Sequence, residues 1–115
     1  MDSAGKFSSY LTESIVKELC RMYSFVRAKD IGLSVLGRPL TVLTIGDGPR
    51  RVFVNAAHHA NEWITSLVLL RFAAEYGAAI DKGGRIFDAD ARALFSSTTL
   101  HLLPLVNPDG VDLVN

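Results

Sequence analysis

Two apolar runs on either side of one long helical run constrain this chain more than any other feature of its sequence. The segments RVFVNAA, at 51–57, and STTLHLLPLV, at 97–106, have the near-continuous apolar character of interior strands. Between them a helical pattern begins at Asn61, a good N-cap, and runs to about Ala79, ahead of the turn residues DKGG. A strand, a helix and a strand in this order predict a βαβ unit with parallel strands.

The segments before this unit predict a helix and a hairpin. From Ser9 to Val26, apolar residues recur every three or four positions, which predicts an amphipathic helix. Apolar residues then alternate at 31–35 and follow again at 40–45, on either side of the turn residues GRP, and this pattern predicts a hairpin. With a short helix expected at 88–95, the elements predict an α/β fold with a mixed sheet and flanking helices.

Composition and charge exclude several classes of partner. The chain has 115 residues, of which 49% are hydrophobic, so it can form one domain with a sizeable core. Its formal net charge of +0 gives no strong field, and we expect neither nucleic acid nor a membrane as a partner. Arg71 and Glu75 interrupt the longest apolar run, which favours a core helix over a membrane span. The first residues lack a secretory signal, so a cytoplasmic location is the default expectation.

Ionisable residues lie where the first interior strand gives way to the long helix. In the stretch HHANE, His59 and Glu62 have the spacing H-x-x-E, so an imidazole and a carboxylate can meet beyond the carboxyl end of a strand. Zn²⁺ accepts such donors and takes three protein ligands in catalytic sites, so the spacing predicts two zinc ligands here. The structural alternative is that both side chains cap the helix and pair with each other. His58 is the second choice, because neighbours on an extended segment face opposite sides.

Three segments, in this order, resemble the zinc carboxypeptidase family, the metallocarboxypeptidases of the carboxypeptidase A type. They are IGLSVLGRPLTVLTIG near the start, HHANEWIT after the apolar strand, and LLPLVNPDGVDLV farther along. The first carries a serine-x-x-glycine-arginine pattern at Ser34, Gly37 and Arg38. Within the family, the chain is most similar to the bacterial branch that cleaves γ-D-glutamyl bonds to diamino acids in cell-wall peptides.

The resemblance implies a zinc-dependent peptidase with a phosphorylase/hydrolase-like, three-layer α/β/α domain. It implies one Zn²⁺ ion with His59 and Glu62 as two of its ligands, and a peptide or muropeptide as substrate. Trp63, Ile64 and Thr65 match the helix start that follows the ligands in the family. The residues NPDG, Asn107 to Gly110, match the loop that flanks the cleft, and their structural alternative is an ordinary turn that ends a strand.

By the same resemblance, residues 1–115 are expected to be the N-terminal part of a single, larger catalytic domain. The family's third zinc ligand, its substrate-binding arginines, its tyrosine and its general-base glutamate have no matching positions in this chain. His101 is not expected to act as the third ligand, because it lies in the middle of a predicted strand. We therefore expect no catalytic residue here, no turnover by this chain alone, and self-association through an uncovered sheet edge.

Two other functions remain open. The related zinc-dependent deacylases have a similar ligand motif but usually carry glycine inside it, where this chain has Ala60 and Asn61. A metal-free binding module would keep the fold without the chemistry. The Gly-rich segment GDG, at 46–48, joins two predicted strands, so it predicts a turn and not a phosphate-binding loop. The segments EWIT and NPDG favour the peptidase.

Overall fold

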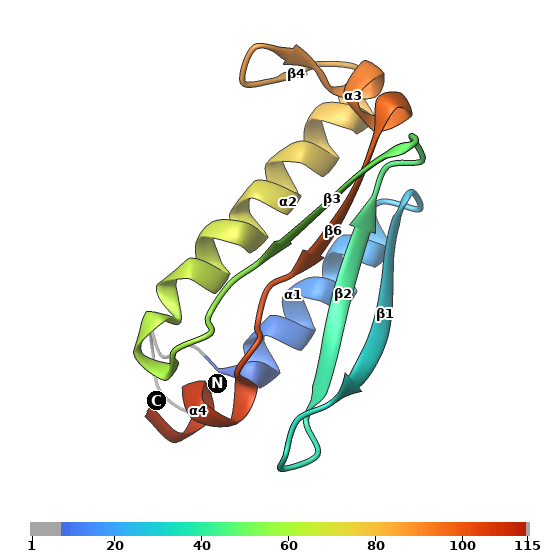
Figure 1. Ribbon diagram of the computed structural model, residues 1–115. Helices are drawn as coiled ribbons and strands as arrows, with labels where there is room; N and C mark the ends of the chain where they lie inside the picture. The colour runs from blue at the N-terminus through green and yellow to red at the C-terminus, as the bar shows by residue number, and fades with distance from the viewer. Residues whose placement is uncertain (1–7, 115) are drawn as a thin grey trace.

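A computed structural model of the chain describes residues 8–114 and contains a mixed sheet, a small hairpin and helices of several lengths (Figure 1). The helical elements are α1 (Ser9–Met22), the 3₁₀ turn η1 (Ala60–Glu62), α2 (Ile64–Lys82), α3 (Ala91–Ser97) and α4 (Pro108–Val114). The strands are β1 (Val26–Leu33), β2 (Pro39–Ile45), β3 (Arg50–Asn55), β4 (Arg85–Ile86), β5 (Ala89–Asp90) and β6 (Thr98–Leu103).

The main sheet has the strand order β1-β2-β6-β3. Strand β2 pairs antiparallel with β1 and with β6, whereas β3 pairs parallel with β6 from Arg50↔Thr98 to Asn55↔Leu103. Parallel neighbours need a crossover connection. Here α2 provides it, because it follows β3 in the chain and runs back along the sheet toward the end at which β6 begins. The predicted βαβ unit and the predicted α/β fold with a mixed sheet and flanking helices are therefore confirmed.

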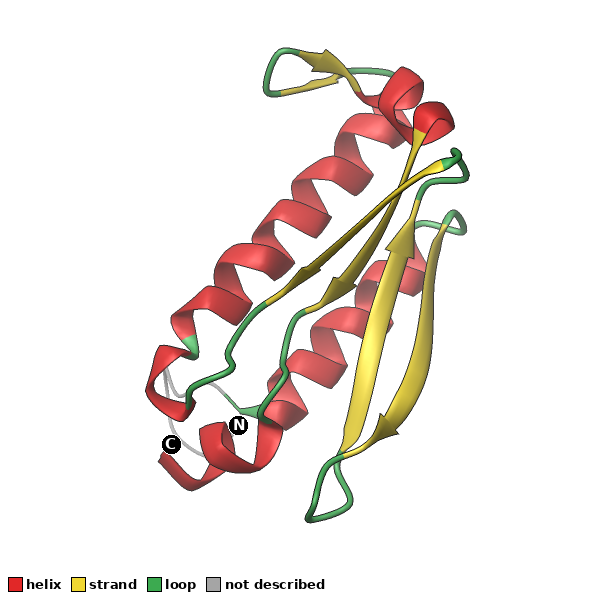
Figure 2. Ribbon diagram, viewed as in Figure 1, coloured by secondary structure: helices red, strands yellow, loops and turns green. Residues whose placement is uncertain are grey.

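Both long helices cover the same face of the sheet, as Figure 2 shows. The core is built from side chains that meet across this interface: Val16 and Leu19 of α1, Leu70, Ala73 and Tyr76 of α2, and Leu43, Ile45, Leu100 and Leu102 of the sheet. The segment Ala60–Lys82 is long and apolar enough to cross a membrane by length and composition alone. In the fold, a stripe of α2 that includes Leu70, Ala73 and Tyr76 packs on the sheet. The apolar side chains of Ile64 and Val68 lie outside this stripe and are 55% and 65% exposed.

The first helix is shorter than its apolar spacing predicts. It ends at Met22, because Tyr23 turns to an extended conformation while its amide still donates to the Leu19 carbonyl. Val26 is buried as predicted, but it lies in β1 and not in the helix. Met22 is 51% exposed. An apolar residue at the next helical position can equally begin a strand, so the spacing did not determine where the helix ends.

Strand β3 corrects a second prediction, since every residue in it is exposed. Its apolar sequence predicts a strand buried on both faces, yet Val52, Phe53 and Val54 are 37%, 54% and 38% exposed. The reason is its position at the end of the strand order, with β6 as its only neighbour in the described part of the chain. An edge strand leaves one row of main-chain groups unpaired and its side chains poorly covered.

The boundaries of α2 also differ from the prediction. Asn61 does not cap the helix, because the chain first makes the 3₁₀ turn η1, and α2 begins at Ile64. At its far end α2 continues past Ala79 to Lys82 and stops at Gly83, which has a positive φ of 71°. The turn residues DKGG therefore end the helix as expected, but slightly later.

The segment GDG forms the predicted turn between β2 and β3. An added Cβ at Gly46 would lie 2.0 Å from the Thr98 carbonyl oxygen, and one at Gly48 would lie 2.0 Å from the Ser97 carbonyl carbon, where α3 gives way to β6; Gly46 also has a φ of 118°. Glycine is therefore required at both positions by the close approach of two backbones. The short helix predicted at 88–95 lies at Ala91–Ser97, where the Asp90 side chain accepts a hydrogen bond from the Ala93 amide.

Candidate metal site

Two segments far apart in sequence meet at one edge of the sheet. Because β3 and β6 are parallel and in register, they end together, and the chain beyond each continues side by side. The Ala56 amide donates to the Leu103 carbonyl at 3.1 Å, and the Val106 and Asn107 amides donate to the carbonyls of Ala56 and Ala57 at 3.0 and 3.1 Å. These bonds bring the start of α4 against η1, at the lower end of the ribbon in Figure 1.

The structure brings His59 and Glu62 together at this edge. His59 is extended, at the N-cap of η1, and the Glu62 amide donates to the His59 carbonyl at 3.0 Å, which closes the turn. The turn places Nδ1 of His59 3.1 Å from Oε1 of Glu62. The two side chains are 76% and 52% exposed. The predicted pair thus exists, open to solvent at the carboxyl end of the sheet.

The geometry of this pair fits a zinc ion. Two donor atoms that each lie about 2.1 Å from one tetrahedral ion are about 3.4 Å apart. The 3.1 Å between His59 Nδ1 and Glu62 Oε1 is close to that separation, so small side-chain rotations would let both atoms bind one ion. Within residues 8–114, no cluster of three or more His, Cys, Asp or Glu side chains is present. The pair therefore offers two donors and leaves any third to another source.

The other two histidines lie elsewhere. The His58 ring is hydrogen-bonded through Nε2 to Oδ1 of Asn55, at the end of β3. His101 lies in the middle of β6, where its Nδ1 is 3.1 Å from Oγ1 of Thr44 on the neighbouring strand. A sheet histidine with a hydrogen-bond partner is what the sequence predicted for His101.

The family-like segments around Ser34 and Asp109 meet in one cluster, the hairpin clasp, made of Ser34, Arg38, Asp109 and Asp112. Asp109 lies in the first turn of α4, and its Oδ1 accepts from Oγ of Ser34 at 2.7 Å and from Nη1 of Arg38 at 2.8 Å. Its Oδ2 accepts from the Leu36 amide at 3.0 Å. Nε of Arg38 also contacts Oδ2 of Asp112 at 2.8 Å.

The hairpin clasp explains two sequence patterns by packing. Residues 34–38 form the tip of the β1–β2 hairpin, and NPDG opens α4, which in turn contacts η1. NPDG is therefore the start of a short helix and not only a turn that ends a strand. Burial opposes ionisation of Asp109, but hydrogen bonds from Ser34, the Leu36 amide and Arg38 lower the pKa of its carboxyl group below the usual value. The sequence did not reveal this pairing, because its partners are distant along the chain.

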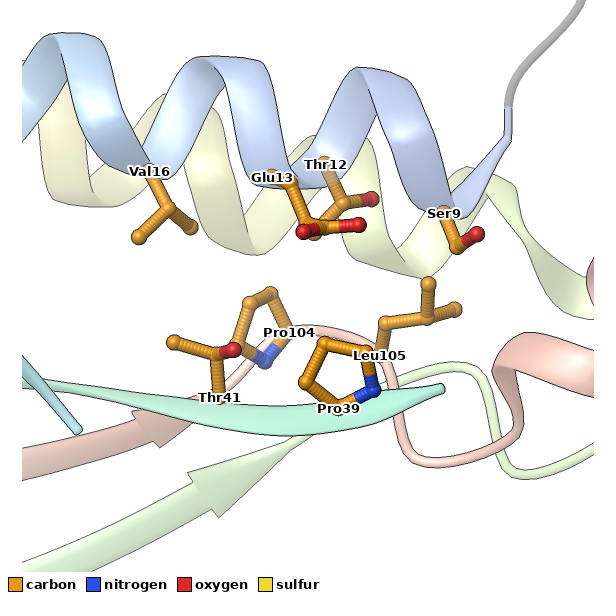
Figure 3. Close-up of a pocket in the computed structure, with 8 residues that line it drawn as sticks. All are labelled: Ser9, Thr12, Glu13, Val16, Pro39, Thr41, Pro104 and Leu105. Carbon is orange, nitrogen blue, oxygen red and sulfur yellow. The ribbon is translucent and has the colours of Figure 1, made fainter. Parts of the chain in front are cut away.

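A small cavity lies away from the metal pair, between α1 and β2 (Figure 3). Its volume is about 20 Å³, enough for a single water molecule. It is lined by Ser9, Thr12, Glu13, Val16, Pro39, Thr41, Pro104 and Leu105. The cavity is too small for a substrate, and neither His59 nor Glu62 lines it.

Known proteins resemble this chain in sequence and in fold. A family model described as zinc carboxypeptidase matches residues 12–115. The uncharacterized protein YqgT of Bacillus subtilis is 45% identical over 89% of the chain, which spans 28% of that relative. Gamma-D-glutamyl-L-diamino acid endopeptidase 1 of Lysinibacillus sphaericus is 40% identical over 86% of the chain, which spans 25% of it. The solved metallo-carboxypeptidase from Burkholderia cenocepacia superposes with a TM-score of 0.80 at 24% identity, over 96% of this chain and 29% of that one.

The hairpin clasp gives the fold a testable pH dependence through Asp109. A lowered folded pKa means that the Asp109 carboxylate stabilises the fold above its unfolded pKa, about 3.9, and that this stability is lost as the pH falls through the lower folded value. We expect Asp109→Asn to unfold at a lower denaturant concentration than the parent at neutral pH, and the difference to shrink below about pH 4. Denaturant titrations followed by circular dichroism measure both effects.

The matched control is Asp47→Asn, which changes an exposed aspartate in the β2–β3 turn. It should unfold like the parent at each pH. If Asp109→Asn were as stable as the parent at neutral pH, or if its deficit persisted unchanged in acid, the clasp would not depend on the ionised carboxylate.

Proposed function

The chain belongs to the zinc carboxypeptidase family, and from that membership we propose that residues 1–115 are the N-terminal part of one metallocarboxypeptidase domain. The chain spans about a quarter of the length of the relatives described above. The whole enzyme would hydrolyse peptide bonds. The 40% identity to a γ-D-glutamyl-diamino acid endopeptidase supports γ-D-glutamyl links of cell-wall peptides as the bonds cleaved.

One observation carries the metal site in this proposal: Nδ1 of His59 lies 3.1 Å from Oε1 of Glu62 beyond the carboxyl ends of two parallel strands. In this proposal the imidazole nitrogen and the carboxylate oxygen hold one Zn²⁺ ion. Such an ion polarises a carbonyl group and lowers the pKa of bound water. His59 and Glu62 hold and orient the metal, and neither transfers a proton to or from the substrate.

The zinc site is tested by calorimetric titration of the chain with Zn²⁺. Because His59→Ala removes one of the two donors, we expect it to weaken Zn²⁺ binding by at least about tenfold. Loss of an outer-shell partner typically costs at least that much affinity, and loss of a ligand should cost no less. The matched control is His58→Ala, whose ring contacts Asn55, and it should bind like the parent. Equal binding by His59→Ala and the parent would contradict the assignment. No binding by any of the three chains would favour the metal-free module.

We also propose that this chain has no peptidase activity alone, even with zinc. It has three histidines, and two of them, His58 and His101, are turned toward Asn55 and Thr44. Two donors bind zinc weakly where catalytic sites use three, and the described edge carries no second carboxylate near Glu62 to act as a general base. Incubation with a γ-D-glutamyl dipeptide and Zn²⁺ should release no free amine. Hydrolysis that a chelator blocks would contradict this prediction.

The exposed edge strand supports self-association as a further part of the proposal. Beside β3, an apolar groove of about 270 Å³ is lined by Val54, Asn55, Ala56, Thr65, Val68, Leu69 and Phe72. We propose that a second copy covers this surface, with the two β3 strands antiparallel. In that orientation, Arg50 and Arg51 of one copy lie at the opposite end of the interface from Arg50 and Arg51 of the other. An in-register parallel pairing would place these like charges together.

Self-association is tested by light scattering over a wide range of concentrations. The parent should shift from monomer toward dimer as concentration rises. Phe53→Lys adds a charge to the edge strand, where Phe53 is 54% exposed, and should keep the chain monomeric. Val35→Lys is the control: this residue is 98% exposed at the tip of the β1–β2 hairpin, on the far side of the sheet order from β3. A parent that stays monomeric at the highest concentration would contradict the proposal.

A further inference from the structure

On its helical side, the turn that carries His59 and Glu62 is bound by the hydroxyl group of Thr65. Oγ1 of Thr65 accepts a hydrogen bond from the Ala57 amide at 2.8 Å and donates one to the Glu62 carbonyl at 2.8 Å. Ala57 precedes the two histidines, and Glu62 ends η1. Thr65 therefore fixes the distance between the two ends of the segment that bears both candidate ligands.

On its other side the turn is held by the carboxamide of Asn107. Nδ2 of Asn107 donates to the His58 carbonyl at 3.2 Å, and Oδ1 accepts from the Gly110 amide at 2.9 Å. A Cβ at Gly110 would lie 2.5 Å from Nδ2 and 2.9 Å from Cγ and Oδ1 of Asn107. Glycine at 110 therefore leaves the space in which the carboxamide reaches the turn.

The backbone between these two contacts is strained. Ala57 has a φ of 59°, which non-glycine residues adopt when their surroundings impose it. The residue is 2% exposed, its amide donates to Thr65, and its carbonyl accepts from the Asn107 amide at 3.1 Å. The bend that directs the chain toward His59 is thus imposed by Thr65 and Asn107 together.

We propose that Thr65 and Asn107 are positioning residues, which hold the main chain of the His59–Glu62 turn in its zinc-binding conformation before the metal arrives. The inference rests on the proposed function, because it supposes that the pair binds zinc. The His59 and Glu62 side chains are 76% and 52% exposed, so packing around them is too sparse to fix their position. Their placement must come from the main chain, and Thr65 and Asn107 bind that main chain on both sides.

The chain offers variants that separate these contacts from general stability. Thr65→Val keeps the shape and removes the hydroxyl, whereas Thr65→Ser keeps the hydroxyl. Asn107→Asp keeps the oxygen that accepts from the Gly110 amide but removes the N–H that donates to the His58 carbonyl. Thr41→Val is the matched control, because the Thr41 hydroxyl donates to Asp30 on the β1–β2 hairpin, away from the turn.

The first measurement is ¹⁵N relaxation of the whole chain without metal. In Thr65→Val and Asn107→Asp, the amide order parameters at 58–62 should fall from the rigid range, about 0.85, toward the flexible range, below about 0.6. They should be unchanged in Thr65→Ser and Thr41→Val. Parent-like order at 58–62 in both Thr65→Val and Asn107→Asp would overturn the positioning role, whatever their zinc affinity.

The second measurement is Zn²⁺ titration followed through the His59 ring resonances. Loss of an outer-shell partner typically lowers metal affinity about 10-fold to 100-fold, so Thr65→Val and Asn107→Asp should each bind at least about tenfold more weakly than the parent. Thr65→Ser, which keeps the hydroxyl, should bind Zn²⁺ with the affinity of the parent. Zinc binding that is equal in all variants, despite a loosened turn, would overturn the positioning role alone. A parent whose His59 resonances do not respond to zinc would instead overturn the proposed metal site, and with it the purpose assigned to both residues.

Discussion

The parallel pairing of β3 with β6 is the interaction on which the rest of this structure depends. It requires a crossover, which α2 supplies, and it makes both strands end at the same edge of the sheet. The segment after β3 carries His59 and Glu62, and the segment after β6 carries Asn107. Had the strands been antiparallel, these residues would lie at opposite ends of the sheet. The candidate site is thus a consequence of strand direction before it is a consequence of side-chain chemistry.

Sequence reasoning succeeded where one local pattern determines the outcome. The strand-helix-strand order predicted the βαβ unit, and the H-x-x-E spacing predicted that His59 and Glu62 approach each other, since a short turn joins them. It failed at boundaries that depend on distant neighbours. Val26 suits a helix stripe and a buried strand equally well, so the end of α1 was placed too late. The apolar residues of β3 could not reveal that the strand lies at the sheet edge, where it stays exposed.

The supporting contacts of the site were beyond the reach of the sequence for a related reason. Thr65 and Asn107 act through main-chain groups at Ala57, His58 and Glu62, and any residue offers such groups. Only the tertiary arrangement determines which hydroxyl or carboxamide reaches them. The patterns around Ser34 and NPDG were noticed as a family resemblance, whereas their physical role, a clasp between the hairpin tip and α4, required the fold.

The contact between the two ends of the described chain affects how it can fold during synthesis. The Ser9 amide and hydroxyl donate to the Asp112 carboxylate at 2.7 and 2.5 Å, across 103 positions of sequence. The first residue of α1 therefore gains this contact only after almost the whole segment has left the ribosome, whereas the contacts of α1 with β1 and α2 involve earlier parts of the chain, and long-range closures of this kind slow folding. During that interval the apolar stripe of α1 has no finished sheet to cover.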